Sequence, residues 1–399
     1  LVDILLDAGA EAQRPVAAAV LQAALRFVDK LLTVGGADER LRNLFASPLT
    51  PALQRVFAHA AAFPDEVFGH AVAVVAAFVH NEPTALAPLQ EAGLPRDMLH
   101  ALRRRVPPVA DLVVRLPHAY SALCLNAAGA AEFAAVDPVP ALVALFLQPE
   151  AARMLRSRGS ATTLGAAMDE FVRHHPRFRA LVVGDILSGL ERLGEALRGP
   201  GLPADALVGC VLPAPGDEPL VPPEGPDARR RSEPVLSQLV ESACLFVEAA
   251  LATPATAGHF ASLRGADALL GAVLRSGGIT YDFTVYNESL SLSHLVRQLA
   301  DADASSALGA VVDALHASAA SGFADDWASF ASAVPPRDAS AASGASGAFQ
   351  RLCGMLMLTG LLRDLLAPGA FMPGSAPAAA ALRLATDAAA DGPTAVSLL

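Results

Sequence analysis

The 399-residue chain is 53% hydrophobic and 17% charged, and its net charge is −11 at pH 7. This composition excludes a chain that is disordered throughout, and it suits one large or two ordinary domains. The acidic charge argues against nucleic acid as a partner, because binding to phosphates relies on basic side chains. Four cysteines are too few for a disulfide scaffold, so we expect a reducing compartment, the cytoplasm or the nucleus.

The chain begins with Leu1 rather than methionine, and we expect it to be a fragment of a longer protein. Acidic residues and Arg14 interrupt the first 15 positions, which excludes the apolar core of a signal peptide. The best membrane candidate, residues 71–79, has only nine residues and is bounded by His70 and His80. We therefore expect no membrane partner, because a spanning helix needs about 18 apolar residues.

Apolar residues recur at helical spacing along most of the chain. Residues 16–32 are the first long example and predict a helix with a wide apolar face. The residues of that face are Val20, Ala23, Ala24, Phe27 and Leu31. The same pattern recurs in residues 51–62, 65–80, 95–104, 117–126, 138–147, 164–174 and 178–197.

Prolines mark the expected starts of many helices, among them Pro83, Pro95 and Pro117, because proline is tolerated in the first turn of a helix. Only residues 279–286 have the alternation of a strand, and since one short strand cannot form a sheet we interpret them as a loop. The pattern predicts an all-α fold, an armadillo/HEAT-like helical solenoid with Pro/Gly-rich linkers.

Composition divides the chain into blocks. Stretches rich in proline, glycine or small residues are typical of flexible linkers between packed segments. We predict a helical block at 1–198, a linker at 199–234, a second block at 235–332, a linker at 333–347, and a short helical segment with an Ala/Pro-rich tail at 348–399.

Candidate chemical groups are scattered. The cysteines lie singly, and Cys124 stands in an apolar helical context where we expect a buried, inert thiol. His174 and His175 are adjacent, so on a helix they point about 100° apart and cannot easily share a metal. Asp325 and Asp326 fit a solvated helix face. We therefore predict no catalytic, cofactor-binding or metal site and expect no cofactor.

Three residues are candidates for partner binding. Arg103 and Arg104 lie in a basic cluster of an acidic chain, where they either bind an acidic partner or complement a helix C-terminus. The arginines of residues 153–158 allow the same two interpretations. Asn126 either holds the backbone of an extended peptide, as on the inner helices of armadillo arrays, or forms a local cap.

Three long motifs, residues 78–94, 116–129 and 164–176, carry a family resemblance. They contain Glu-Pro-Thr-Ala-Leu-Ala-Pro-Leu-Gln-Glu-Ala-Gly-Leu, Ser-Ala-Leu-Cys-Leu-Asn and Leu-Gly-Ala-Ala-Met-Asp-Glu-Phe-Val-Arg-His. In this order the segments resemble the N-terminal region, a domain of unknown function, of the giant HECT-type E3 ubiquitin ligases of the Mule, Tom and UPL types. The resemblance covers about residues 65–198, with a weaker match at 241–274.

The resemblance implies armadillo-like repeats in a non-catalytic scaffold that recruits substrates for a HECT ligase. The catalytic domain is expected outside this chain, since no cysteine here has the context of the family's thioester cysteine. Protein substrates, adaptor proteins and the rest of the ligase chain are the implied partners. The alternative is a stand-alone armadillo-like adaptor without ligase activity. As structural roles we expect Pro83 and Pro117 to start helices, Gly93 and Gly129 to end them, and Leu123, Leu125 and Phe133 to fill the core.

Overall fold

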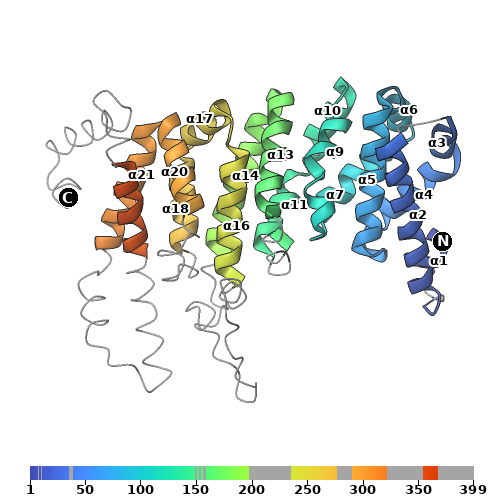
Figure 1. Cartoon of the computed structure of the whole chain (residues 1–399), viewed down its shortest axis with the longest axis horizontal. Helices are drawn as coiled ribbons and strands as arrows, with labels where there is room; N and C mark the ends of the chain where they lie inside the picture. The colour runs from blue at the N-terminus through green and yellow to red at the C-terminus, as the bar shows by residue number, and fades with distance from the viewer. Residues whose placement is uncertain are drawn as a thin grey trace, which may run out of the picture. The chain divides into compact units, whose positions relative to one another are not determined.

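A computed structural model describes residues 1–35 except 8 and 10, 39–148, 151, 154–155, 159–196, 235–275, 290–320 and 354–366. This part of the chain is all-α and contains no strand, which confirms the predicted fold class (Figure 1). The armadillo-like detail of the prediction stays a prediction. Outside the described residues lie the predicted loop at 279–286, both linkers, Asp325 and Asp326, Cys210 and Cys353, and Arg153, Arg156 and Arg158.

The chain divides into two compact units. The first unit comprises Leu1–Leu145 and Ser157–Asp185, and the second comprises Phe146–Arg156 and Ile186–Leu399. The predicted block boundaries at 199–234 and 333–347 fall outside the described residues and stay predictions.

The first unit consists of helices that pack in two series. In one series α2 packs against α5, α5 against α9, and α9 against α13; in the other, α4 packs against α7, and α7 against α10 and α11. Its helices are α1 (Val2–Leu6), α2 (Arg14–Gly35), α3 (Glu39–Leu44), α4 (Thr50–Ala58), α5 (Asp65–Asn81), α6 (Leu86–Glu91), α7 (Leu94–Arg104), α8 (Ala110–Val113), α9 (Leu116–Leu123), α10 (Ala127–Val136), α11 (Val139–Val143), α13 (Ser160–His174) and the start of α14 (Arg179–Ala196). A π-helix, η1 (Phe45–Leu49), follows α3, and short 3-10 helices are η2 (Ala60–Ala62), η3 (Pro83–Ala85), η6 (Pro176–Phe178) and the first half of η4 (Ala144–Leu147).

Several helix ends follow directly from the residues predicted to set them. Pro83 begins η3, and Pro117 lies in the first turn of α9. Gly93 follows the C-cap of α6 with a φ of 84°, a left-handed conformation that glycine adopts without the penalty of a Cβ. The two arginines of the last turn of α7, Arg103 and Arg104, complement the negative end of its dipole.

The core beneath α9 and α13 is aromatic. Leu123 and Phe133 are fully buried, as predicted. The Phe133 ring centroid lies 4.9 Å from that of Phe178 and 5.2 Å from that of Tyr120. Leu125, which we expected in the core, is 53% exposed. Because α9 ends at Leu123, the side chain of Leu125 lies in the turn before α10, on the surface.

Gly129 corrects a second expectation, because it does not end a helix. It lies in the first turn of α10, where its backbone N–H donates to Asn126 Oδ1 at 2.8 Å. A Cβ at this position would lie 1.9 Å from the carbonyl oxygen of Leu123 and 2.8 Å from Gln90 Nε2. The glycine is therefore required by a close approach of two backbone segments.

Helix α2 forms as predicted but presents its periodic apolar face to solvent. Val20, Phe27 and Leu31 are exposed, and so are the two alanines between them. The helix buries a different side, with Leu25 and Leu32, against the rest of the unit. The periodicity of the sequence thus located the helix but not the side that packs.

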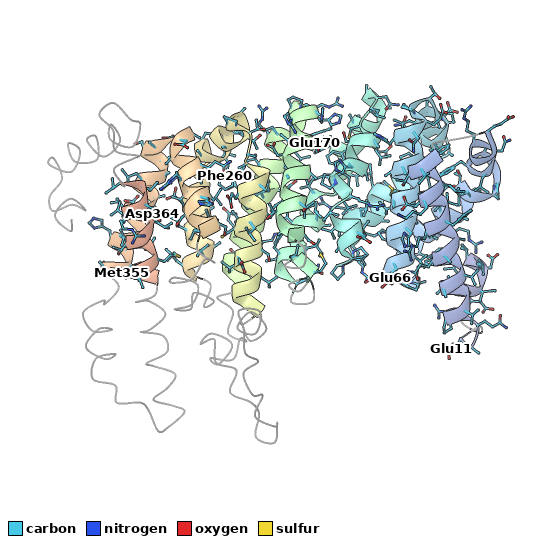
Figure 2. All side chains as sticks on the ribbon, in the orientation of Figure 1. Glu11, Glu66, Glu170, Phe260, Met355 and Asp364 are labelled. Atoms are coloured by element: carbon cyan, nitrogen blue, oxygen red, sulfur yellow. The ribbon has the colours of Figure 1, made fainter. Side chains whose placement is uncertain are left out.

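The second unit repeats the pattern of short packed helices. Phe260, labelled in Figure 2, is fully buried. Its ring packs against Gly265 so closely that a Cβ added to this glycine would lie 2.1 Å from the ring. Packing pairs α16 with α20, α17 with α20, α18 with α21 and α20 with α21. The helices are the end of α14, α16 (Val235–Ala250), α17 (Pro254–Ser262), α18 (Gly265–Arg275), α20 (Leu290–Ala302), α21 (Ala304–Ala320) and helical residues 354–365.

Within the described residues, no single helix has both the length and the apolar character to cross a membrane. Three pairs of consecutive helices, each bent sharply at the break between them, reach the length and apolar composition of a membrane span together.

Candidate functional site: a groove across α2, α5, α9 and α13

A groove of about 910 Å³ runs across one face of the first unit, and we call it the central groove. Its floor is made by small side chains of two neighbouring helices, Ala73, Ala76 and Ala77 of α5 and Ala119 and Ala122 of α9. Polar side chains form much of its rim. They are Asp29, Thr33, His80, Asn81, Arg115, His118, Ser121, Glu170, His174 and His175, and the exposed Leu125 joins them.

The sequence of α5 explains the groove. One side of this helix carries large residues such as Phe68, Val75 and Phe78, all buried. The groove side carries the three alanines, which are only half-buried. Alanine favours the helix but fills little volume, so a hollow remains where larger side chains would close the surface.

An ion pair between a buried carboxylate and an exposed arginine lines the central groove. Asp29 of α2 is only 5% exposed, and its Oδ2 lies 3.2 Å from Nη1 of Arg115 at the N-cap of α9. A buried carboxylate requires such a partner, since an unpaired charge is costly away from water. Both residues also line an adjoining pocket of about 300 Å³, which includes His70.

Five of the ten histidines line the central groove or this adjoining pocket: His70, His80, His118, His174 and His175. Burial lowers the pKa of His70 from its usual 6.5, and nearby Arg26 and Arg115 lower it further against the opposing effect of Asp29. Burial also lowers the pKa of His175, with Arg177 and His174 adding to it. At neutral pH these two rings are therefore uncharged, and a neutral ring both donates and accepts hydrogen bonds.

Two of the rim histidines have polar neighbours. His175 Nε2 lies 3.0 Å from Ser121 Oγ, and His174 Nε2 lies 3.6 Å from Glu170 Oε1, on the residue labelled in Figure 2. The His175 ring also packs against Phe171, with centroids 5.2 Å apart, and among the described residues no carboxylate orients it. The Ser121–His175 pair thus lacks the third member of a catalytic triad and suits hydrogen bonding to a bound segment.

Among the described residues, no three His, Cys, Asp or Glu side chains lie close enough to hold a metal ion. Cys124 and Cys244 are buried, which bears out the expected burial of Cys124. Burial raises the pKa of each thiol to about 12. Both are therefore protonated at neutral pH, and only the thiolate is a good nucleophile.

The three residues predicted to bind a partner lie outside the central groove. Asn126 caps α10 and exchanges two hydrogen bonds with Gln90, at 2.9 and 3.1 Å. Arg103 contacts Asp137 at the C-terminal end of α10. The two ends of this ten-residue helix, one capped by Asn126 and the other by Asp137, are about 15 Å apart. Arg104 donates to the carbonyl of Phe57 at 3.2 Å. The structure gives each of the three a structural contact, and their partner binding stays a prediction.

Sequence reasoning missed the groove histidines. The sequence predicted no shared site for these histidines, because His80, His118 and His175 are far apart along the chain. Their common signal is position, since His80 and His174 lie in the last turns of α5 and α13, and His118 lies near the start of α9. Only the packing of these helices side by side shows that the positions share one face.

The described part of the first unit is an all-helical stack with a surface groove, an architecture that by itself assigns no function. Residues 11–206, which contain every residue of the central groove, match the family described as Domain of Unknown Function (DUF913). The match begins at residue 11 and so extends upstream of residue 65, where the resemblance seen in the sequence begins.

Curated relatives agree with the resemblance. Over 194 residues the chain is 32% identical to the E3 ubiquitin-protein ligase HUWE1 of Mus musculus, which covers 47% of this chain and 4% of the relative. It is 30% identical over 178 residues to the E3 ubiquitin-protein ligase ptr1 of Schizosaccharomyces pombe, covering 45% and 6%. It is 28% identical over 180 residues to the E3 ubiquitin-protein ligase TOM1 of Saccharomyces cerevisiae, covering 45% and 6%. The chain thus spans only a small part of the length of each relative.

Proposed function

We propose that this chain is a non-catalytic scaffold of an E3 ubiquitin-protein ligase that recruits protein substrates through the central groove. The similarity to three ligases supports the ligase context. The observation that carries the recruiting role is the groove itself, about 910 Å³, with an apolar floor and a polar rim, lying wholly within the residues that match DUF913. Surfaces of this kind recognise partners by shape and hydrogen bonding without bond chemistry.

The chemistry of the described cysteines supports a non-catalytic role. Ubiquitin transfer by a HECT-type ligase passes through a thioester on a cysteine, which must first act as a thiolate. Cys124 and Cys244 are buried, with a pKa of about 12, and neither lines the central groove. In this proposal the thioester forms elsewhere in the ligase, in the cytoplasm or nucleus, and this chain holds the substrate.

The lining of the groove favours an extended protein segment as its occupant. The half-buried alanines of α5 and the buried alanines of α9 are small, so they let a main chain approach the floor closely. Ser121 and the imidazoles of His80 and His118 supply hydrogen-bonding groups along the rim. Leu125 offers an exposed apolar contact at the same rim. A bound segment would thus pair its polar main chain with the rim and lay small or apolar side chains on the floor.

The test compares proteins captured from the cells of origin by the full chain with those captured by a Leu125→Glu/His118→Glu variant. Leu356→Glu is the matched control, because Leu356 is 49% exposed and lies outside the central groove. We expect the groove variant alone to lose a set of proteins whose ubiquitylation falls when the gene is deleted.

Identical capture by the groove variant would overturn the recruiting role. Capture that depends on the groove, with ubiquitylation unchanged on deletion, would favour the stand-alone adaptor. Variants of Arg103, Arg104 and Asn126 in the same assay test the separate contact surface predicted for them.

A further inference from the structure

The long helix α2 carries an apolar stripe on its solvent side, distinct from the central groove. The stripe consists of Val16, Val20, Phe27, Leu31 and Val34, with Ala23 and Ala24 between them. Phe27 is 63% exposed and Val34 is 87% exposed. Successive members are three or four residues apart, so they lie on one side of the helix over about 27 Å.

A stripe of this spacing is the surface that a second helix covers in side-by-side helix packing. Steps of three and four residues keep apolar contacts aligned along two helices that cross at a shallow angle. Large apolar side chains normally scatter singly over a surface, whereas here they form one continuous row. The length of the row suits a partner helix of about five turns.

The charges of α2 are all of one sign at its surface. Arg26 and Lys30, the latter the only lysine of the chain, are exposed beside the stripe on the side of the adjoining pocket. Among the described residues neither forms an ion pair. The only acidic residue of α2 is Asp29, which is buried and paired with Arg115. Glu66 of α5 and Asp111 of α8 line the same pocket, but among the described residues neither forms an ion pair with Arg26 or Lys30. The edge that α2 itself exposes beside the stripe is therefore basic.

This charge pattern disfavours a second copy of the chain as the occupant. Two stripes packed together would bring Arg26 and Lys30 of both copies into one interface, and α2 exposes no acidic side chain to pair with them. Like charges along such an edge are unfavourable in helix pairs, and opposite charges select the partner.

We propose that the α2 stripe binds an amphipathic helix of a protein partner that carries acidic side chains along the edge facing Arg26 and Lys30. Apolar residues of the partner at three- and four-residue spacing cover Phe27 and its neighbours, and its acidic edge pairs with the two cations. This surface is separate from the central groove and requires no step of ubiquitin transfer, so its failure would leave the proposed function untouched.

The experiment measures fluorescence anisotropy of a labelled synthetic peptide with the full chain. The peptide has three heptads with leucine at positions a and d and glutamate at e and g, and a second peptide has lysine at e and g. We expect the glutamate peptide to bind more tightly than the lysine peptide. Phe27→Glu should weaken the binding about ten-fold or more, whereas Leu356→Glu should not change it.

Charge reversal provides a variant that leaves the packing of α2 intact. Arg26→Glu/Lys30→Glu should reverse the preference, so that the lysine peptide binds more tightly, with an unchanged circular dichroism spectrum. Absence of binding by both peptides, or a preference that the reversal does not alter, would overturn the proposal. A concentration-dependent dimer in analytical ultracentrifugation that Phe27→Glu abolishes would also overturn it, by assigning the stripe to a second copy.

Discussion

The carbonyl oxygen of Leu123 and the Cα of Gly129 approach so closely that a Cβ at position 129 would lie 1.9 Å from that oxygen. The contact joins the last residue of α9 to the first turn of α10, beside the Asn126 cap. It fixes the tight turn that brings Leu125 to the rim of the central groove. The turn is thus held by a glycine that cannot be replaced without moving backbone.

Gly129→Ala should destabilise the chain by about 2 kcal/mol or more, because backbone must shift to relieve the overlap. The matched control is Gly184→Ala in α14, where nothing lies within 4 Å of the added Cβ. That change should stabilise by about 0.5–1 kcal/mol, since alanine favours a helix over glycine. Urea unfolding of the full chain measures both, and equal effects would refute the account of this turn.

Leu123→Ala should cost about 2–5 kcal/mol, because it leaves a cavity in the aromatic core. Leu125→Ala, two residues away, removes the same atoms from an exposed side chain and should cost less than about 1 kcal/mol. The comparison needs only the two unfolding curves. A Leu123→Ala curve that coincides with wild type would show that Leu123 has no core role.

Asn126→Ala should destabilise by about 1–2 kcal/mol, because it removes the α10 cap and leaves Gln90 without its partner. Asn126→Asp keeps an oxygen for the Gly129 N–H and should recover most of this loss. The measurement is again the free energy of unfolding. If Asn126→Ala loses captured proteins but no stability, the residue serves a partner rather than the fold.

Burial lowers the pKa of His70 and of His175, so the folded chain binds protons at these sites only at lower pH than the unfolded chain does. Stability should therefore fall as the pH drops below about 6.5, where the unfolded state takes up these protons first. His70→Gln/His175→Gln should make the loss between pH 7.5 and 5.5 smaller. An identical pH dependence in the double variant would contradict these pKa directions.

Much of the fold was predictable because local chemistry decides it. Helical periodicity, Pro117 and Gly93 located elements that the structure confirms. Local patterns failed where distant packing decides the outcome. Leu125 and Gly129 follow the end of α9, and only the approach of α10 shows that one is exposed and the other confined.

The candidate site was less predictable than the fold. Helix α2 has apolar residues at helical spacing on two of its sides. Contacts with α5 determine which of these sides is buried. His80, His118 and His175 share one groove only because α5, α9 and α13 pack in series. A single sequence contains no signal for this neighbourhood, since 95 positions separate the first of these histidines from the last.

The central claim is that this scaffold works as part of an E3 ubiquitin-protein ligase, and long-read sequencing of full-length cDNA across this reading frame tests it most directly. We expect a transcript whose frame continues into a HECT-type domain with a C-terminal thioester cysteine. A frame that starts and stops close to residues 1 and 399 would contradict it, leaving a stand-alone adaptor that is similar to the ligases over part of its length.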